Sequence, residues 1–248
     1  MFLKPSGMPY LRFLQTLHET CLFDWYLEVG CRSGKSFAPV RSKTTAVDPF
    51  FRAEINIIGK KPALHVFQQT SDDFFASGFL TRNGIRLGLA FLDGMHLFEF
   101  LLRDFMNTEK AMDPKGVILL HDCVPFNVDM TTRDLDNLPR GAWTGDVWKL
   151  IPILQTWRPE LKVTVLDCRP TGIVCVSGLD PDNRVLAENY DRIVAEFSSK
   201  TIEEFGVERF FGSFGMENAR TERRLGFPLF QAACIPGEMA LTPQRVTP

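Results

Sequence analysis

The feature that most constrains the fold is the stretch at 26–36, Tyr-Leu-Glu-Val-Gly-Cys-Arg-Ser-Gly-Lys-Ser. It predicts a buried strand, then a turn containing Gly30 and Gly34, then a helix over about 34–40. Glycines suit such a turn because backbone without a Cβ can approach a ligand closely. A second apolar run ends at Asp48. A strand, a glycine turn, a helix and a strand ending in an acid are typical of a nucleotide-binding unit, in which the second acid holds the ribose hydroxyls.

The turn differs from the two common phosphate-binding motifs. Arg32 stands where the dinucleotide motif G-x-G-x-x-G needs its middle glycine, and Gly30 and Gly34 are too close together for a P-loop. Glu28, directly before the turn, suits a ligand with an amino group and therefore favours S-adenosylmethionine over a dinucleotide. The alternative is an ordinary strand-to-helix turn that is rich in glycine.

Apolar runs and helix-like segments alternate through the first 180 residues. The runs lack polar alternation, which indicates strands covered on both faces and hence a mostly parallel sheet. The last two runs are separated only by Cys-Arg-Pro-Thr, so they form an antiparallel hairpin. We predict an α/β fold: a Rossmann-like seven-stranded, mostly parallel sheet with an antiparallel last strand and helices on both faces. The predicted strands are 25–30, 44–48, 63–68, 87–92, 116–121, 161–167 and 172–178, and the helices are about 34–40, 72–79, 96–112 and 145–156.

Three regions follow from this alternation. Residues 1–24 are predicted to form an N-terminal lead-in helix, 25–179 the main domain, and 180–248 a C-terminal helical appendage and tail, with one helix from Val185 to Phe197. The segment 123–144 interrupts the pattern with prolines and polar residues. A loop of that length inside a compact domain is often functional.

Composition limits the classes of function. The net charge of −2 and the pI of about 6.1 give no indication of a basic surface that would bind nucleic acid. No apolar run approaches the roughly 20 residues of a membrane span, and no signal peptide is visible. The six cysteines form no C-x-x-C pair, which argues against a zinc knuckle and for a reduced, cytoplasmic location. Five phenylalanines could form an apolar contact in a homo-oligomer: Phe210, Phe211, Phe214, Phe227 and Phe230.

An ordered series of motifs resembles the class I S-adenosylmethionine-dependent methyltransferases, in particular the group acting on sugars and small metabolites. The series comprises Glu-Val-Gly-Cys-Arg-Ser-Gly-Lys-Ser (28–36), Ala-Val-Asp-Pro (46–49), Gln-Gln-Thr-Ser-Asp-Asp (68–73), Phe-Leu-Asp-Gly-Met-His (91–96), Arg-Asp (103–104) and Gly-Val-Ile-Leu-Leu-His-Asp (116–122). The antiparallel seventh strand also matches that family. The resemblance implies O-methylation of a small hydroxylated metabolite or sugar.

The resemblance also implies which residues bind the cofactor. Glu28 would lie near the methionine amino group, and Asp48 would accept both ribose hydroxyls. Thr70 and Ser71 would occupy the adenine turn, although Ser71 could equally be a helix N-cap. The full set of candidate cofactor-binding residues is Glu28, Gly30, Arg32, Ser33, Gly34, Ser36, Asp48, Ser71 and Asp93. Arg32 is a departure, because many members have a glycine there.

A second group of polar residues follows two strands of the predicted sheet. Asp93 and His96 follow one strand, and His121 and Asp122 follow the next. Parallel strands hold ligands at their carboxyl ends, so these residues should converge. The resemblance to metal-dependent O-methyltransferases implies a divalent cation on Asp93, His121 and Asp122, with Mg²⁺ suited to the carboxylates and the histidine favouring Mn²⁺, Zn²⁺ or Fe²⁺. His121, Asp122 and His96 are the candidate catalytic residues.

Alternatives remain open at this point. His96 or His121 could be a metal-free general base, or His121 a buried structural histidine. Arg133 could bind an acidic acceptor, and Asp104 is expected in a solvated i,i+4 pair or a cap. Four residues could line an acceptor pocket or simply pack on the sheet: Trp143, Asp146, Trp148 and Lys149.

Two other functions compete with the methyltransferase reading. One is a metal-dependent hydroxylase or hydrolase built on the same sheet. The other is a non-catalytic cofactor-binding module, which would not need Asp93, His121 and Asp122.

Overall fold

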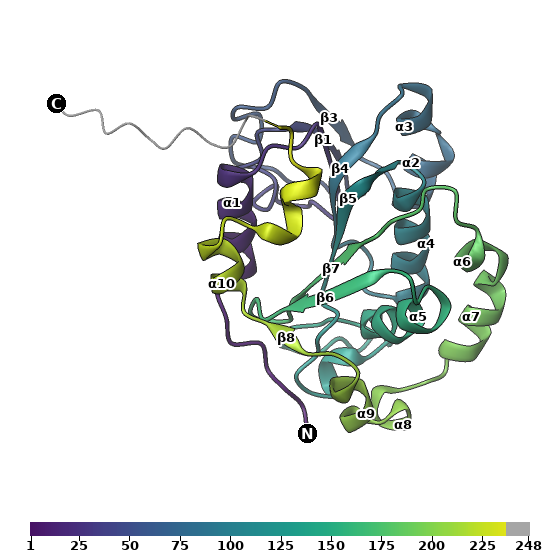
Figure 1. Cartoon of the computed structure of the whole chain (residues 1–248). Helices are drawn as coiled ribbons and strands as arrows, with labels where there is room; N and C mark the ends of the chain where they lie inside the picture. The colour runs from purple at the N-terminus through teal and green to yellow at the C-terminus, as the bar shows by residue number, and fades with distance from the viewer. Residues whose placement is uncertain (237–248) are drawn as a thin grey trace.

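The computed structural model describes residues 1–236 and is built on one eight-stranded sheet with the order β3-β2-β1-β4-β5-β7-β6-β8 (Figure 1). Strand β7 is antiparallel to both of its neighbours, and the other pairings are parallel. The predicted fold class is therefore confirmed, with one addition: β8 joins the sheet from the C-terminal segment. The strands are β1 Trp25–Val29, β2 Lys43–Val47, β3 Leu64–Phe67, β4 Leu87–Leu92, β5 Met112–His121, β6 Lys162–Leu166, β7 Ile173–Ser177 and β8 Met216–Glu217.

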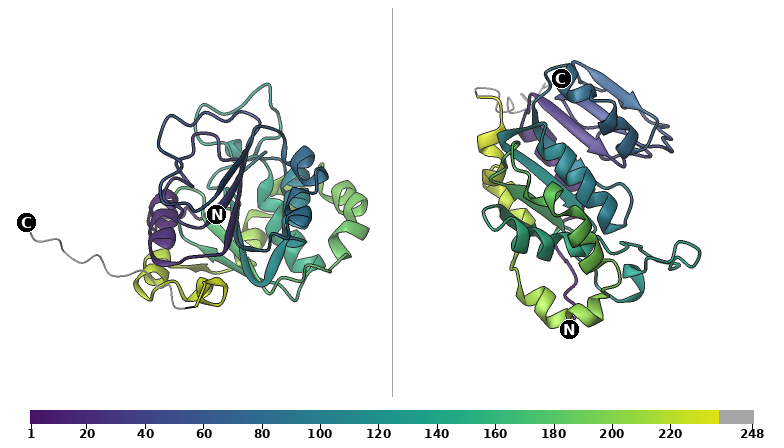
Figure 2. Two further views of the ribbon diagram at one scale, coloured as in Figure 1. Left: turned by 90° about the horizontal axis from the view of Figure 1, so that it is seen from above. Right: turned by 90° about the vertical axis from the view of Figure 1, so that its right-hand side faces the viewer.

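Helices cover both faces of this sheet. Helices α1 and α10 and the 3-10 helix η3 lie on one side, and α2, α4, α5 and α7 lie on the other (Figures 1 and 2). No helix within residues 1–236 is long and apolar enough to cross a bilayer. The α-helices are α1 Tyr10–Thr20, α2 Ser71–Ala76, α3 Phe79–Arg82, α4 Phe98–Glu109, α5 Leu150–Trp157, α6 Val185–Glu188, α7 Tyr190–Phe197, α8 Ile202–Phe205, α9 Val207–Gly212 and α10 Ala219–Arg224. The 3-10 helices are η1 Asp129–Thr131, η2 Val147–Lys149 and η3 Pro228–Ala233.

Each central strand contributes to two apolar cores, because successive side chains point to opposite faces of a sheet. In β4, Leu89 and Phe91 belong to the core beneath α1 and η3, whereas Ala90 and Leu92 belong to the core beneath α4 and α5. All six residues of β4 are buried. This double burial is why the sequence shows an uninterrupted apolar run there.

The glycine turn after β1 is not followed by a helix, so the helix predicted over 34–40 is wrong. Residues 31–40 form successive turns. Gly34 has a φ of +75°, and a Cβ on it would lie 2.6 Å from the Ile57 side chain. The β2–β3 connection thus packs directly on the turn and takes the space beside it. The helix predicted from Val185 to Phe197 also differs, because it is divided at Asn189 into α6 and α7.

The C-terminal segment packs against the rest of the chain. Phe227 and Phe230 are fully buried and contact Phe13 of α1, with ring centroids 5.5 and 6.2 Å away. Phe210 and Phe211 are buried as well. These rings stabilise the fold and give no support to the predicted homo-oligomer. The domain boundary at 179 stays a prediction, and residues 237–248 of the predicted tail lie outside the described residues.

The packing of η3 on α1 can be tested with two matched substitutions. Phe230→Ala removes a fully buried ring, and we expect it to lower the free energy of unfolding by about 3–5 kcal/mol. Phe50→Ala removes a ring that is 73% exposed, and it should change that free energy by less than about 0.5 kcal/mol. Urea denaturation measures both. Equal effects would contradict the packing of the C-terminal segment.

Candidate functional site

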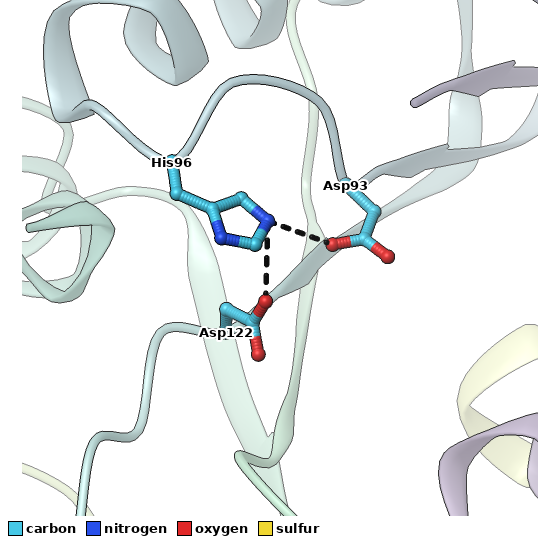
Figure 3. A group of neighbouring side chains, drawn as sticks. All are labelled: Asp93, His96 and Asp122. Carbon is cyan, nitrogen blue, oxygen red and sulfur yellow. Dashed lines mark ion pairs between the residues drawn. The ribbon is translucent and has the colours of Figure 1, made fainter. Parts of the chain in front are cut away.

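The side chains of Asp93, His96 and Asp122 converge at the carboxyl edge of the sheet (Figure 3). Asp93 directly follows β4 and Asp122 directly follows β5, and these strands are parallel neighbours. Nε2 of His96 lies 3.5 Å from Oδ1 of Asp93 and 3.2 Å from Oδ2 of Asp122. One ring nitrogen therefore faces two carboxylates.

The other ring nitrogen of His96 is held by the backbone. Nδ1 lies 2.9 Å from the carbonyl oxygen of Trp143, and because a carbonyl only accepts, Nδ1 carries the hydrogen in this contact. Histidines that bind metals usually donate their second N–H to a carbonyl or carboxylate in this way. Nε2 and the two carboxylate oxygens lie within 4.8 Å of one another. This donor set fits a divalent cation, whose ligands at about 2.1 Å lie about 3 to 4 Å apart.

His121 has a different place from the one expected. Its ring is buried, and its Nδ1 lies 3.1 Å from Oδ1 of Asp93 and 3.4 Å from Oδ1 of Asp122. The ring centroid is 4.1 Å from that of Tyr10 and 5.7 Å from that of Phe91. The imidazole of His121 thus packs against two aromatic rings, and its Nδ1 contacts both carboxylates and helps to orient them. The group whose geometry could hold a cation is thus Asp93, His96 and Asp122, whereas the resemblance implied His121 in the position of His96.

Charges in this cluster stabilise one another. Burial acts to raise the pKa of Asp93, but the charge of His121 and hydrogen bonds from both histidines outweigh it and lower the pKa to about 2. Burial acts to lower the pKa of His96 and of His121, yet the two aspartates raise both above the usual range. The cluster therefore favours the ionised form of Asp93 and the protonated forms of both histidines.

Asp122 is held in an unusual backbone conformation. Its φ of +59° is in the left-handed region, which costs a non-glycine residue about 1–3 kcal/mol and is common at functional sites. Oγ1 of Thr171 donates to Oδ1 of Asp122 at 2.5 Å, and Val124 N donates to the Thr171 carbonyl. The β6–β7 connection therefore fixes the direction of this carboxylate.

The predicted cofactor residues lie at the ends of β1 and β2. Glu28 is fully buried and accepts hydrogen bonds from the Tyr26 hydroxyl, at 2.5 Å, and from the Ser36 hydroxyl. Burial raises its pKa to about 7, although both hydroxyls act to lower it. Glu28 thus ties the turn to β1, and a ligand reaches it only where Ser36 gives way.

Asp48 is also bonded to backbone. Oδ2 accepts from the amide of Arg32 at 2.7 Å and Oδ1 from the amide of Phe50 at 2.6 Å. Each oxygen keeps a second lone pair for a hydroxyl. The side chain of Arg32 is exposed and Ser33 is half-buried in the same turn.

Gly30 is required by the contact between two strand ends. Its φ is +86°, and a Cβ would lie 1.9 Å from the carbonyl oxygen of Asp93. The turn is therefore packed directly against the backbone of Asp93. Gly30 and Gly34 are thus both needed where the chain packs closely on itself, and their contact with a cofactor stays a prediction.

The adenine turn predicted at Thr70 and Ser71 opens α2. Thr70 is the N-cap, since its hydroxyl accepts from the amide of Asp73, and Ser71 is the first helical residue. Asp104 is buried rather than solvated, and burial raises its pKa to about 7, although the Ser71 hydroxyl acts to lower it. Arg103 pairs with Asp72 of α2, not within its own helix.

The residues near the long loop are not arranged as an open pocket. Trp148 packs on Phe205 and Phe210, and Asp146 and Lys149 form a buried ion pair. The guanidinium of Arg133 is bound by Glu99 and Asp146, so it is not free for an acidic acceptor.

Three contacts at the site have no signal in the sequence. They are the ring of Tyr10, the hydroxyl of Thr171 and the carbonyl of Trp143. Each comes from a segment far from the strand ends in sequence, and none belongs to a motif.

A family model described as "Methyltransferase domain" matches residues 27–123. Residues 27–123, which are less than half of the chain, are therefore similar to a methyltransferase domain. The match begins in β1 and ends just after β5, so it includes Glu28, Asp48, Asp93, His96 and Asp122. It confirms the resemblance to the S-adenosylmethionine-dependent methyltransferases.

Solved structures of methyltransferases are also similar to this chain. TomG from Streptomyces achromogenes, an O-methyltransferase of tomaymycin synthesis in complex with SAM, is 14% identical, with a TM-score of 0.47 over 68% of this chain and 77% of that one. An O-methyltransferase from Bacillus cereus in complex with SAH is 14% identical, with a TM-score of 0.46 over 69% and 82%. A putative caffeoyl-CoA O-methyltransferase from Staphylococcus aureus is 12% identical, with a TM-score of 0.47 over 67% and 81%. No curated protein matches the chain.

The buried carboxyl of Glu28 leads to a prediction about how stability depends on pH. Because the pKa of Glu28 is about 7 in the fold and 4.5 ordinarily, the folded state holds a proton that the unfolded state has lost between these values. Stability therefore falls as pH rises from 4.5 to 7 and is lowered by a constant amount above that, about 3 kcal/mol. In Glu28→Gln this contribution is absent.

Urea denaturation from pH 4.5 to pH 8 checks this. The free energy of unfolding of Glu28→Gln, relative to the unmodified protein, should increase by about 3 kcal/mol across that range. A difference that stays constant with pH would show that Glu28 is ionised throughout.

Proposed function

We propose that this methyltransferase transfers a methyl group to a hydroxyl of a small metabolite or sugar, with a divalent cation held by Asp93, His96 and Asp122. The observation that carries the proposal is that three possible ligand atoms, one from each of these side chains, lie within 4.8 Å of one another. Nε2 of His96 faces both carboxylates at 3.5 and 3.2 Å while its Nδ1 is held by a backbone carbonyl. S-adenosylmethionine, when bound, supplies the methyl group on a sulfonium carbon.

The cofactor side of the proposal is supported by carboxyl groups at neighbouring strand ends. Glu28, Asp48 and Asp93 belong to the ends of β1, β2 and β4, and β1 lies between the other two. The hydrogen-bond partners of Glu28 are hydroxyls rather than cations. A buried carboxyl of this kind would gain from a ligand ammonium, which stabilises its charged form. Asp48 would accept the ribose hydroxyls through its remaining lone pairs.

The acceptor side is supported by the composition of the cluster. A cation there would bind acceptor oxygens and lower the pKa of the hydroxyl that is methylated. Two carboxylates suit Mg²⁺, and an imidazole adds preference for Mn²⁺ or another transition metal. His121 would hold Asp93 in place by its hydrogen bond, as partners of metal ligands generally do.

The geometry favours a cation over a metal-free histidine base. A general base must be neutral and must point at the acceptor proton. The two aspartates raise the pKa of His96, and its Nε2 points at them. A cation would replace the proton on Nε2 and satisfy both carboxylates together.

The proposed function is tested by calorimetric titration with S-adenosylhomocysteine, first with EDTA and then with added Mg²⁺ or Mn²⁺. We expect binding of the cofactor product and a separate binding event for the cation. Asp48→Ala should weaken cofactor binding by tenfold or more, at about 1.4 kcal/mol per tenfold, because the ribose loses its acceptor. Unchanged affinity in Asp48→Ala would remove that residue from the cofactor site, and no binding under any condition would refute the proposal.

Histidine variants separate the proposed cation ligand from its supporting residue. His96→Ala removes a ligand and should lower the affinity for Mn²⁺ by more than about 100-fold, whereas His121→Asn should lower it by about 10-fold to 100-fold. His65→Ala, on β3 and stacked on Trp25, is the control and should leave the affinity unchanged. Electron paramagnetic resonance of free Mn²⁺ measures all three. A larger loss in His121→Asn than in His96→Ala would return the ligand role to His121.

A further inference from the structure

The segment between β5 and η2 returns to the site and contacts His96 at several points. The carbonyl of Trp143 accepts from Nδ1 of His96 at 2.9 Å, and the two rings lie 5.0 Å apart. The amide of Asp146 donates to the carbonyl of His96 at 3.2 Å. Gly145 has a φ of +52°, and a Cβ there would lie 1.6 Å from that same carbonyl oxygen. This close fit allows no side chain at position 145.

The carboxylate of Asp146 anchors this segment to α4. Oδ1 accepts from the amide of Phe98, the first residue of α4, at 2.9 Å. The N-cap residue of α4, Leu97, provides no side-chain hydrogen bond, so Asp146 replaces the missing cap from elsewhere in the chain. A carboxylate at a helix N-terminus is favoured by the orphan amides and by the helix dipole. This cap lies two residues after His96.

Two cations hold the same carboxylate from the other side. Oδ2 of Asp146 accepts from Arg133 at 2.5 Å and from Lys149 at 2.6 Å. Arg133 also makes a two-point contact with Glu99, in the first turn of α4, at 2.6 and 2.9 Å. Lys149 also donates to the carbonyl of Phe197, the last residue of α7, at 2.6 Å. The network therefore ties both ends of the segment 133–146 to the start of α4.

We propose that Asp146 is a positioning residue for His96: by holding the segment 143–146 on α4, it keeps the Trp143 carbonyl on Nδ1 and so leaves Nε2 for the cation. The proposal rests on the proposed function for the cation itself. In this proposal, the ring nitrogen of His96 that carries the hydrogen is determined by the ion pairs of Asp146 with Arg133 and Lys149. These ion pairs contact neither the His96 ring nor the two carboxylates beside it. Without the network, either ring nitrogen could carry the hydrogen.

A second buried ion pair on the same helix provides the matched control. Glu109 ends α4 and binds Arg158 at 2.8 and 3.0 Å, with both side chains buried. Glu109→Gln disturbs α4 to a comparable degree at the end far from His96. It should lower stability without changing the histidine.

The test uses three variants of the full chain: Asp146→Asn, Arg133→Gln and Glu109→Gln. Asn keeps an oxygen for the Phe98 amide but loses the charge that binds Arg133 and Lys149. Arg133 is partly exposed, so its variant remains informative where Asp146→Asn fails to fold. In protein with ¹⁵N-labelled histidine, with EDTA and at alkaline pH, long-range ¹H–¹⁵N spectra show which nitrogen of His96 carries the hydrogen. The His96→Gln spectrum assigns the signal.

We expect the hydrogen on Nδ1 in the unmodified protein and in Glu109→Gln, and a mixture of the two forms in Asp146→Asn and Arg133→Gln. The affinity for Mn²⁺ should fall by about 10-fold to 100-fold in the last two and stay within about twofold in the control. The proposal is overturned if both network variants keep the hydrogen on Nδ1. Absence of Mn²⁺ binding to the unmodified protein would refute the cation in the proposed function, while the spectra would still decide the role of Asp146.

Discussion

Two carboxylates at the ends of neighbouring strands set the main constraint on this structure. One carboxylate oxygen each of Asp93 and Asp122 and a ring nitrogen of His96 all lie within 4.8 Å of one another. Two like charges at about 4 Å repel by about 4 kcal/mol at an effective dielectric constant of about 20. The surrounding residues offset that repulsion. His121 lies beneath the pair, His96 faces it from the turn before α4, and Thr171 donates to Asp122. A cation bound between these side chains would take the place of the proton that the two carboxylates favour on Nε2 of His96.

Much of this arrangement could be predicted from sequence because it follows from strand topology. Uninterrupted apolar runs marked the buried parallel strands, and parallel neighbours necessarily bring Asp93 and Asp122 to one edge. The sequence also brought His96 to this edge, but the orientation of its ring could not be predicted, since that depends on the carbonyl of Trp143, 47 residues away. The missing helix after Gly34 has a similar cause: Ile57, from the next connection, packs where the pattern alone allowed the turn to continue as a helix.

Buried charge also links regions that the sequence pattern separated. Lys149 is 1% exposed and is shared between Asp146 and the carbonyl that ends α7. A buried cation needs such partners, because an unpaired one would cost several kcal/mol. The residues from 180 onward were predicted to form an appendage. Their Phe197 carbonyl nevertheless binds Lys149, which pairs with Asp146, and the amide of Asp146 donates to the carbonyl of His96. Polar residues with no motif of their own acquire a role through these pairings alone.

The long loop is fastened at Arg133 and again at Trp143, and the chain between these two points is mostly exposed, including Leu135 and Leu138. Extra residues inserted between fixed ends add little entropic cost, about 0.6 kcal/mol for each doubling of loop length. The tip of the loop can therefore change in length and composition while the imidazole of His96 keeps its contact with the Trp143 carbonyl. The exposed residues between Arg133 and Trp143 can therefore vary in evolution without moving the side chains of the site.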